Sequence, residues 1–233
     1  MKHLPGKSYL RKLSAGDRSY YETKQKILEG VLAPGQPIVE EDLASELEIS
    51  RTPLRSGLQQ LEFENLVVRK SNGRLIVAPV SIQEVKEVFK VRGRLEEIAV
   101  EEATDNATEE DIKNLSNIVY MIKRANKSGE IDDILYYGSQ FHNYIYDLSG
   151  NQTVSNILAQ LNDHIHRYRR LVPKKHMEKL NVEEDEHEVI LEYMTKKDKK
   201  GAQQAIRRHI QNSLETAVGA IKLLEDEKME EVK

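Results

Sequence analysis

The chain has 233 residues, of which 39% are hydrophobic and 32% charged, a composition typical of a soluble, helix-rich protein of one or two domains. It contains no cysteine, which excludes disulfides and thiolate metal sites. Neither a secretion signal nor a run of the roughly 18–20 apolar residues of a membrane span is evident. We therefore expect a cytoplasmic protein with no membrane partner.

The net charge of −4 is unevenly distributed along the chain. Residues 1–80 contain 12 Lys and Arg against 10 Asp and Glu, a net charge of +2, whereas residues 81–233 contain 23 against 29, a net charge of −6. A slightly basic first part joined to an acidic second part suggests that the two parts meet different partners.

The first part, residues 18–80, follows a stretch of 17 residues without apolar periodicity that we expect to be a flexible arm. The expected helices cover about 20–32, 40–47 and 51–63, and the expected strands cover 66–70 and 74–79. In the first helix, Val31 is expected to face inward with its apolar neighbours. The "SNG" between the strands favours a hairpin, because Asn and Gly accept positive φ.

The third of these helices begins with two arginines, Arg51 and Arg55. Basic side chains usually favour the other end of a helix, because the helix dipole is positive at the N-terminus. Ser50 is a good N-cap residue. An apolar stripe is expected from Leu54, Leu58, Leu61 and Phe63. The arginines lie away from this stripe, so their charge needs a partner outside the core.

Two helices joined by a tight turn, with exposed basic residues opening the second, form a helix-turn-helix, and the hairpin would be its wing. The candidate DNA contacts are Arg51, Thr52 and Arg55 of the helix and Asn72, Gly73 and Arg74 of the hairpin. The helix residues would meet base edges or phosphates, and the wing would lie near the backbone or minor groove. The alternative is that the two arginines only solvate a surface face, with Glu48 nearby.

The run "ILEGVLAPGQPIVEEDLASELEISRTPLRSGLQQLEFENLVV" resembles the winged-helix region of the GntR family of bacterial transcriptional regulators. The family's glycine-proline turn is matched by "GVLAPG", and its helix-turn-helix motif by "LASELEISRTPLR". The resemblance implies that Arg51, Thr52 and Arg55 contact an operator. One departure is Gly57, which should cost roughly 0.5–1 kcal/mol relative to Ala inside a helix.

The second part, residues 81–226, has helical periodicity throughout and predicts an all-α bundle of six to seven helices. The expected helices cover about 81–103, 108–127, 131–148, 153–171, 180–196 and 198–226. Asp198 is the expected cap between the last two. Residues 227–233 form a charged tail.

Three histidines lie on apolar stripes of three different helices in this bundle: His142, His187 and His209. A single histidine on such a stripe is more often a core residue with satisfied hydrogen bonds than a metal ligand. Three neutral imidazoles that converge in a bundle core would suit Zn²⁺ or a similar divalent ion. The residues alone leave both interpretations open.

The segments "RGRLEE", "QFHNYIYDLSGN" and "DEHEVILEYMTKKDKKGAQQAIRRHI" resemble the FCD ligand-binding domain of the FadR subfamily, over about residues 82–220. The resemblance implies a divalent metal (Zn²⁺, or Ni²⁺ or Mn²⁺) bound by one Asp and by His142, His187 and His209. The Asp is expected at position 138, where this chain has Gly138. Either the open position is filled by water, by the effector or by an acid such as Glu96, or the chain binds no metal.

Arg92 lies on the apolar face of the helix 81–103 and must be paired, because an uncompensated buried charge is costly. One interpretation is an ion pair with Glu96 four residues later. The other is that Arg92 and Glu96 belong to the effector site, where a guanidinium would bind a carboxylate through two hydrogen bonds.

Together these features predict a ligand-responsive transcriptional regulator, not an enzyme. We expect a homodimeric repressor that binds a palindromic double-stranded operator and is released by a small organic acid. Two alternatives remain: a metalloenzyme with a three-histidine site, and a DNA-binding dimer that responds to no ligand.

Overall fold

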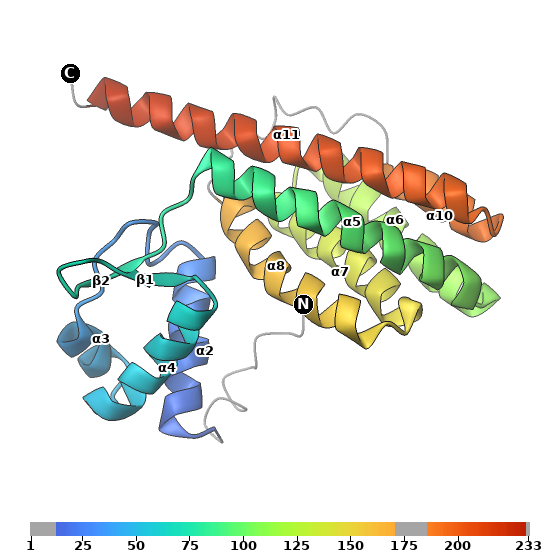
Figure 1. Ribbon diagram of the computed structural model, residues 1–233. Helices are drawn as coiled ribbons and strands as arrows, with labels where there is room; N and C mark the ends of the chain where they lie inside the picture. The colour runs from blue at the N-terminus through green and yellow to red at the C-terminus, as the bar shows by residue number, and fades with distance from the viewer. Residues whose placement is uncertain (1–12, 171–185, 232–233) are drawn as a thin grey trace. The chain divides into compact units, whose positions relative to one another are not determined.

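The computed structural model describes residues 13–170 and 186–231, with side chains up to residue 168 and from 186 to 223. The chain divides into two compact units (Figure 1). In the described part, the first unit comprises residues 13–81 and 163–170, and the second comprises 82–162 and 186–231. The expected fold class is confirmed: a winged helix-turn-helix is followed by a helical bundle.

The first unit contains three helices and a two-stranded antiparallel hairpin, in the predicted order. These are α2 (Ala15–Leu28), α3 (Glu40–Glu46), α4 (Arg51–Phe63), β1 (Val67–Arg69) and β2 (Leu75–Val77). Val67 pairs with Val77 across the hairpin. Pro37, just before α3, bridges to Ile76, so the segment that leads into α3 lines the free edge of β2.

The first helix begins and ends earlier than predicted. Ser14 caps it by accepting a hydrogen bond from the Asp17 amide at 3.1 Å, so residues 15–17 are helical and not part of an arm. Residues 1–12 of the expected arm lie outside the described part. The helix ends at Leu28 because Gly30 adopts a φ of 76°. The inward placement of Val31 was wrong: it is 60% exposed in the turn that follows.

The core of the first unit is built on the apolar stripe of α4. Leu54, Leu58 and Leu61 are almost fully buried, as expected. Phe63 is 87% exposed, so its assignment to the stripe was wrong. Two residues correspond to about 200° around a helix, which turns Phe63 to the face opposite Leu61. Leu66, immediately before β1, is buried in its place.

The presence of a glycine at position 57 is explained by helix packing, which the sequence does not reveal. A Cβ atom at this position would lie 2.1 Å from the Ser19 Oγ and 2.7 Å from the Tyr20 backbone nitrogen of α2. The Ser19 hydroxyl lies 3.0 Å from the Pro53 carbonyl of α4 and 2.8 Å from the Gly16 carbonyl of its own helix, and its one proton is shared between these two acceptors. The glycine therefore allows α2 and α4 to touch, which offsets its low helix propensity.

The second unit is a helical bundle. Its described helices are α5 (Ile82–Asn106), α6 (Glu109–Ser128), α7 (Ile131–Ser149), α8 (Gln152–Arg170, of which residues up to Asn162 belong here), α10 (Glu186–Thr195) and α11 (Lys199–Glu231). α5 packs against both α11 and α7, and α10 packs against α11 and α6 (Figure 1). These contacts bring α5, α7, α10 and α11 around one interior.

The helix boundaries of this unit are close to the predicted ones except at the end of α11. This helix continues to Glu231, so the expected tail was wrong for residues 227–231. Asp198 caps α11 as expected, accepting a hydrogen bond from the Gly201 amide at 3.0 Å. Residues 180–185 of the predicted sixth helix lie outside the described part. Within residues 13–170 and 186–231, none of the helices combines the length and the apolar character needed to cross a bilayer.

Candidate nucleic-acid interface and metal centre

The N-terminal turn of α4 carries the three helix residues expected to contact DNA. Arg51, Thr52 and Arg55 are all exposed, and none of them contributes to the core. Ser50 occupies the N-cap position in an extended conformation, but its side chain makes no capping hydrogen bond. The expected cap is therefore absent, which leaves backbone donors at this end of α4 accessible to an acceptor from outside.

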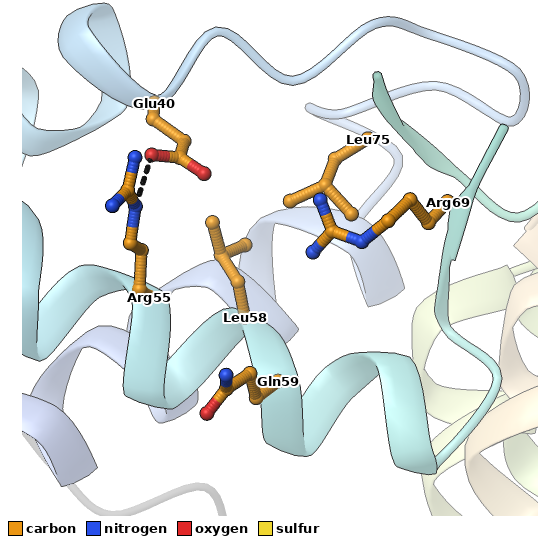
Figure 2. Close-up of a pocket in the computed structure, with 6 residues that line it drawn as sticks. All are labelled: Glu40, Arg55, Leu58, Gln59, Arg69 and Leu75. Carbon is orange, nitrogen blue, oxygen red and sulfur yellow. Dashed lines mark hydrogen bonds and ion pairs between the residues drawn. The ribbon is translucent and has the colours of Figure 1, made fainter. Parts of the chain in front are cut away.

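Both arginines are paired with glutamates of α3. The Arg51 Nη2 lies 2.9 Å from the Glu41 Oε2, and the Arg55 Nε lies 2.7 Å from the Glu40 Oε2 (Figure 2 shows the second pair). The acid we expected near them, Glu48, is not their partner. It follows α3 with a φ of 52°, and neither arginine pairs with it in the described structure.

A small cavity of about 150 Å³ lies between α4 and the wing. It is lined by Glu40, Arg55, Leu58, Gln59, Arg69 and Leu75 (Figure 2). Leu58 and Leu75 are buried apolar residues, while the polar residues come from the surfaces around them. Because Arg55 lines this cavity, it lies at the boundary between α4 and the hairpin.

The wing turn exposes its three candidate contacts, Asn72, Gly73 and Arg74. The Asn72 Oδ1 accepts a hydrogen bond from the Arg74 amide at 3.1 Å, an Asx turn that shapes the tip. Gly73 has a φ of 79°, in the region that favours glycine. The Arg74 side chain is exposed next to this turn.

Arg69 of β1 was missed by the sequence reasoning. Its Nε and Nη2 bind both carboxylate oxygens of Glu62, at 3.2 and 3.0 Å, and its Nη1 donates to the Gly73 carbonyl at 3.2 Å. All three guanidinium nitrogens are thus used within the domain. Arg69 connects the wing turn to α4, a role that local sequence pattern does not indicate.

The structure brings the three predicted histidines together. His142 comes from α7, His187 from α10 and His209 from α11. One ligand nitrogen of each lies within 4.8 Å of the other two. His142 and His209 are buried and His187 is partly exposed. The three apolar stripes therefore meet in the interior of the bundle.

Two carboxylates determine how the histidine rings are oriented. The His142 Nδ1 lies 2.7 Å from the Glu96 Oε2, and the His209 Nδ1 lies 2.9 Å from the Glu186 Oε2. An ionised carboxylate only accepts hydrogen bonds, so both Nδ1 atoms carry a proton. In a neutral imidazole the other nitrogen, Nε2, then presents a lone pair.

The two Nε2 atoms lie 3.1 Å apart. Two lone pairs at this distance repel each other unless a proton or a metal cation lies between them. Two ligands of a tetrahedral ion with metal–nitrogen bonds of ~2.0–2.1 Å are about 3.3 Å apart. The separation of His142 and His209 is close to this value, and carboxylate–histidine–metal arrangements orient ligands in the same way.

Burial keeps His142 neutral in this cluster. Burial lowers the pKa of His142 to about 4, although the adjacent Glu96 carboxylate opposes the shift. Burial would raise the pKa of Glu96, but the Arg92 guanidinium, followed by His142, holds it well below its usual range. At neutral pH the pair is a carboxylate and a neutral imidazole, the form that binds a metal.

Arg92 is 1% exposed and pairs with Glu96 as the i,i+4 interpretation predicted, with the Nε 2.6 Å from the Oε1. The Tyr146 hydroxyl donates to the same oxygen at 2.7 Å, and burial raises the Tyr146 pKa well above its ordinary value. Both Glu96 oxygens are thus occupied, so Glu96 orients His142 and does not fill the open position. The Arg92 Nη1 has no hydrogen-bond partner among the described residues.

Gly138 is buried on α7, one turn before His142. Apart from the neighbouring backbone of α7 itself, no atom of the described residues lies within 4 Å of the position that its Cβ would occupy. The cluster therefore has space on the side where the resemblance places an aspartate. The donor set of three imidazole nitrogens with this space fits a divalent ion that keeps an open coordination position.

Glu40, Glu41 and Glu186 also escaped the sequence reasoning. Glu40 and Glu41 belong to the acidic start of α3, which is ordinary for a helix N-terminus and carries no sign of a partner on α4. Glu186 directly precedes His187 in sequence, but it contacts His209 of another helix. Only the tertiary arrangement reveals these pairings.

Two family models match the chain in the expected places. The model described as "Bacterial regulatory proteins, gntR family" matches residues 17–77. The model described as "FCD domain" matches residues 87–212, more than half of the chain. The first match contains the helix-turn-helix and wing, and the second contains all three histidines.

Similar proteins are transcriptional regulators. The chain is 29% identical to the HTH-type transcriptional regulator YdhC of Bacillus subtilis, over 84% of this chain and 88% of the relative. It is 27% identical to the gluconate operon transcriptional repressor of the same species, over 82% of this chain and 80% of the relative. The solved structure of McbR/YncC from Escherichia coli superimposes with a TM-score of 0.72 at 21% identity, over 88% of this chain and 97% of that one. The chain thus belongs to the FCD-domain family, carries a gntR-family helix-turn-helix domain in front of it, and is a ligand-responsive DNA-binding transcriptional regulator and not an enzyme.

Proposed function

We propose that the protein is a homodimeric repressor, active in the bacterial cytoplasm, that a small organic acid releases from a palindromic operator. Each protomer would present α4 to the major groove and the wing to the adjacent backbone. The three histidines would hold a divalent ion in the FCD domain, and the acid would bind beside it. The similarity to a gluconate operon transcriptional repressor supports repression.

The single observation that carries the effector site is the facing pair of Nε2 atoms, 3.1 Å apart, on His142 and His209. Because each Nδ1 is held by a carboxylate, the cluster attracts a cation. A divalent ion there would supply a positive charge and an open position beside Gly138. Arg92 adds a buried guanidinium with an unpartnered Nη1, so the surroundings are complementary to an anion.

The DNA contacts are proposed from exposure and chemistry. Arg51, Thr52 and Arg55 are the exposed polar groups at the start of α4, and arginine binds guanine through two hydrogen bonds. Asn72, Gly73 and Arg74 form the exposed tip of the wing. A two-fold dimer would place two such surfaces on successive half-sites, which is why the operator is expected to be a palindrome.

Selection from a random-sequence duplex library by the full-length chain tests the DNA-binding part. The selected duplexes should share a two-fold repeat, and Arg51→Ala or Arg55→Ala should weaken their binding by about 1–3 kcal/mol if the arginine reads a guanine edge. Both variants should melt like the wild type, because the side chains are exposed. Unchanged affinity in both variants would contradict the recognition-helix assignment.

Mass spectrometry and metal analysis of gently purified protein test the effector part. We expect a divalent ion and a retained carboxylate. The identified acid should release the selected duplex, whereas its uncharged amide should not, because the amide lacks the charge that a cation and Arg92 attract. Equal release by acid and amide, or release by neither, would contradict a carboxylate effector at this site.

A further inference from the structure

The two arginine–glutamate pairs between α3 and α4 differ in one detail of geometry. Glu40 binds Arg55 through Nε at 2.7 Å, the inner nitrogen of the guanidinium. Glu41 instead binds Arg51 through Nη2 at 2.9 Å, one of the two terminal nitrogens. Arginine reads guanine with two nitrogens of its fork, so these contacts have opposite consequences.

Glu40 leaves both terminal nitrogens of Arg55 available. Neither of them has a partner elsewhere in residues 13–168 and 186–223. The Glu40 side chain is only 25% exposed, whereas that of Arg55 is 63% exposed, so the glutamate is the fixed member of the pair (Figure 2). Glu40 therefore holds Arg55 with its fork directed outward, which reduces the side-chain freedom that binding would remove.

Glu41 does the reverse, because it occupies a nitrogen that a base would need. Its side chain is 76% exposed and that of Arg51 is 55% exposed, so this pair can open. To bind DNA, Arg51 must leave Glu41, and the carboxylate then faces the phosphate backbone. A guanine within reach of Arg51 can compensate for the lost ion pair by accepting two hydrogen bonds, whereas a random sequence offers no such acceptors at that position.

The charge of the DNA-binding part supports this difference. Residues 1–80 have a net charge of only +2, so attraction to DNA of any sequence is weak and each acidic residue near the interface matters. We propose that Glu40 and Glu41 set operator specificity: Glu40 is a positioning residue that presents Arg55, and Glu41 is a competitor that suppresses binding of Arg51 to non-cognate DNA. This inference rests on the proposed role of α4 in DNA recognition.

The test compares Glu40→Gln and Glu41→Gln with Asp42→Asn in the full-length chain. Asp42 is exposed on the same helix, and its side chain has no ion-pair or hydrogen-bond partner in the part of the chain that the structure describes. Its variant makes the same change in charge and so reports the general electrostatic effect. The probes are a duplex selected by the wild type and the unselected library, at one salt concentration.

Relative to Asp42→Asn, Glu40→Gln should bind the selected duplex about tenfold more weakly, with little change on the library. Glu41→Gln should bind the library several-fold more tightly and the selected duplex about equally. The ratio of the two affinities thus falls in both variants, but for opposite reasons. The base pair relaxed by Glu40→Gln should be the one relaxed by Arg55→Ala, a result that a purely structural role would not give.

Double variants complete the test. In an Arg55→Ala background Glu40→Gln should add nothing beyond Asp42→Asn, and the same should hold for Glu41→Gln in an Arg51→Ala background. If both glutamate variants behave like Asp42→Asn, the inference is wrong while DNA recognition by α4 stands. If the wild type selects no duplex at all, the proposed DNA-binding role fails, and the inference fails with it.

Discussion

His142 and His209 face each other through their Nε2 atoms at 3.1 Å, while Glu96 and Glu186 hold the two Nδ1 atoms. This relationship joins four helices of the bundle, α5, α7, α10 and α11, through side chains that are otherwise costly to bury. A cation between the rings would turn mutual repulsion into a contact that stabilises the fold.

The protonation of His142 gives the first prediction. In metal-free protein, burial lowers its pKa from 6.5 to about 4 against the effect of Glu96. Below pH 6.5 the unfolded chain binds a proton that the folded chain does not, so the free energy of unfolding should fall as pH drops from about 6.5 through 4, by on the order of 3 kcal/mol. Nuclear magnetic resonance of the imidazole nitrogens should show a neutral His142 at about pH 5. A His142 that titrates at or above 6.5 would contradict this.

The space beside Gly138 gives the second prediction. Gly138→Asp should fit without strain, since no other part of the described chain comes within 4 Å of the new Cβ. It should place a carboxylate one turn before His142 and tighten Zn²⁺ binding, on the order of tenfold. It should also weaken the acid effector, because the carboxylate fills the open position and adds repulsion. Calorimetric titration measures both affinities, and Gly219→Asp, at an open helical position of α11, is the control. Unchanged affinity for the ion would place the metal elsewhere.

The contact between α2 and α4 gives the third prediction. Ala is a better helix former than Gly, yet Gly57→Ala should destabilise the protein by about 1–3 kcal/mol, because its Cβ would lie 2.7 Å from the Tyr20 backbone nitrogen, which cannot rotate away as the Ser19 Oγ can. Chemical denaturation of the full chain measures this change. Gly138→Ala, a helical glycine with open space, should be neutral or stabilising. A Gly57→Ala variant more stable than the wild type would show that α2 and α4 can separate at little cost.

The wing gives the fourth prediction. Arg74→Ala should weaken binding to all duplexes and reduce the number of ions released on binding, measured from the salt dependence, by roughly one, because an exposed arginine at the tip would contact phosphates. Arg69→Ala should act differently, since Arg69 is bound to Glu62 and to the Gly73 carbonyl. Loss of the Arg69 side chain should increase the rate of amide hydrogen exchange in the wing turn. If Arg74→Ala instead relaxes preference at one base pair, the wing reads sequence.

The order of elements was predictable because its signals are local. The "SNG" turn, the apolar spacing of Leu54, Leu58 and Leu61, and the Asp198 cap each depend on a few neighbouring residues. The meeting of the three histidines was also foreseeable, because each lies on an apolar stripe and stripes pack inward. Resemblance to a known domain added the expectation that they share one site.

What could not be predicted depends on distances between helices. Nothing near Gly57 in sequence indicates that Ser19 packs against it, and nothing near Glu186 indicates that it contacts His209. The error at Phe63 was of another kind, because its position about 200° from Leu61 on α4 already separates it from the apolar stripe. Arg51 and Arg55 were identified as exposed, but their glutamate partners lie on another helix.

Calorimetric titration of Zn²⁺ into chelator-treated full-length protein tests the histidine site most directly. The account predicts saturable binding of one ion per chain, a higher melting temperature on binding, and loss of both in variants that replace His142, His187 or His209 with Asn. Replacement of His166, a histidine outside the cluster, should leave binding unchanged. Absence of saturable binding by the wild type would contradict a metal centre at these histidines. Binding by the three cluster variants that is as tight as binding by the wild type would contradict it as well.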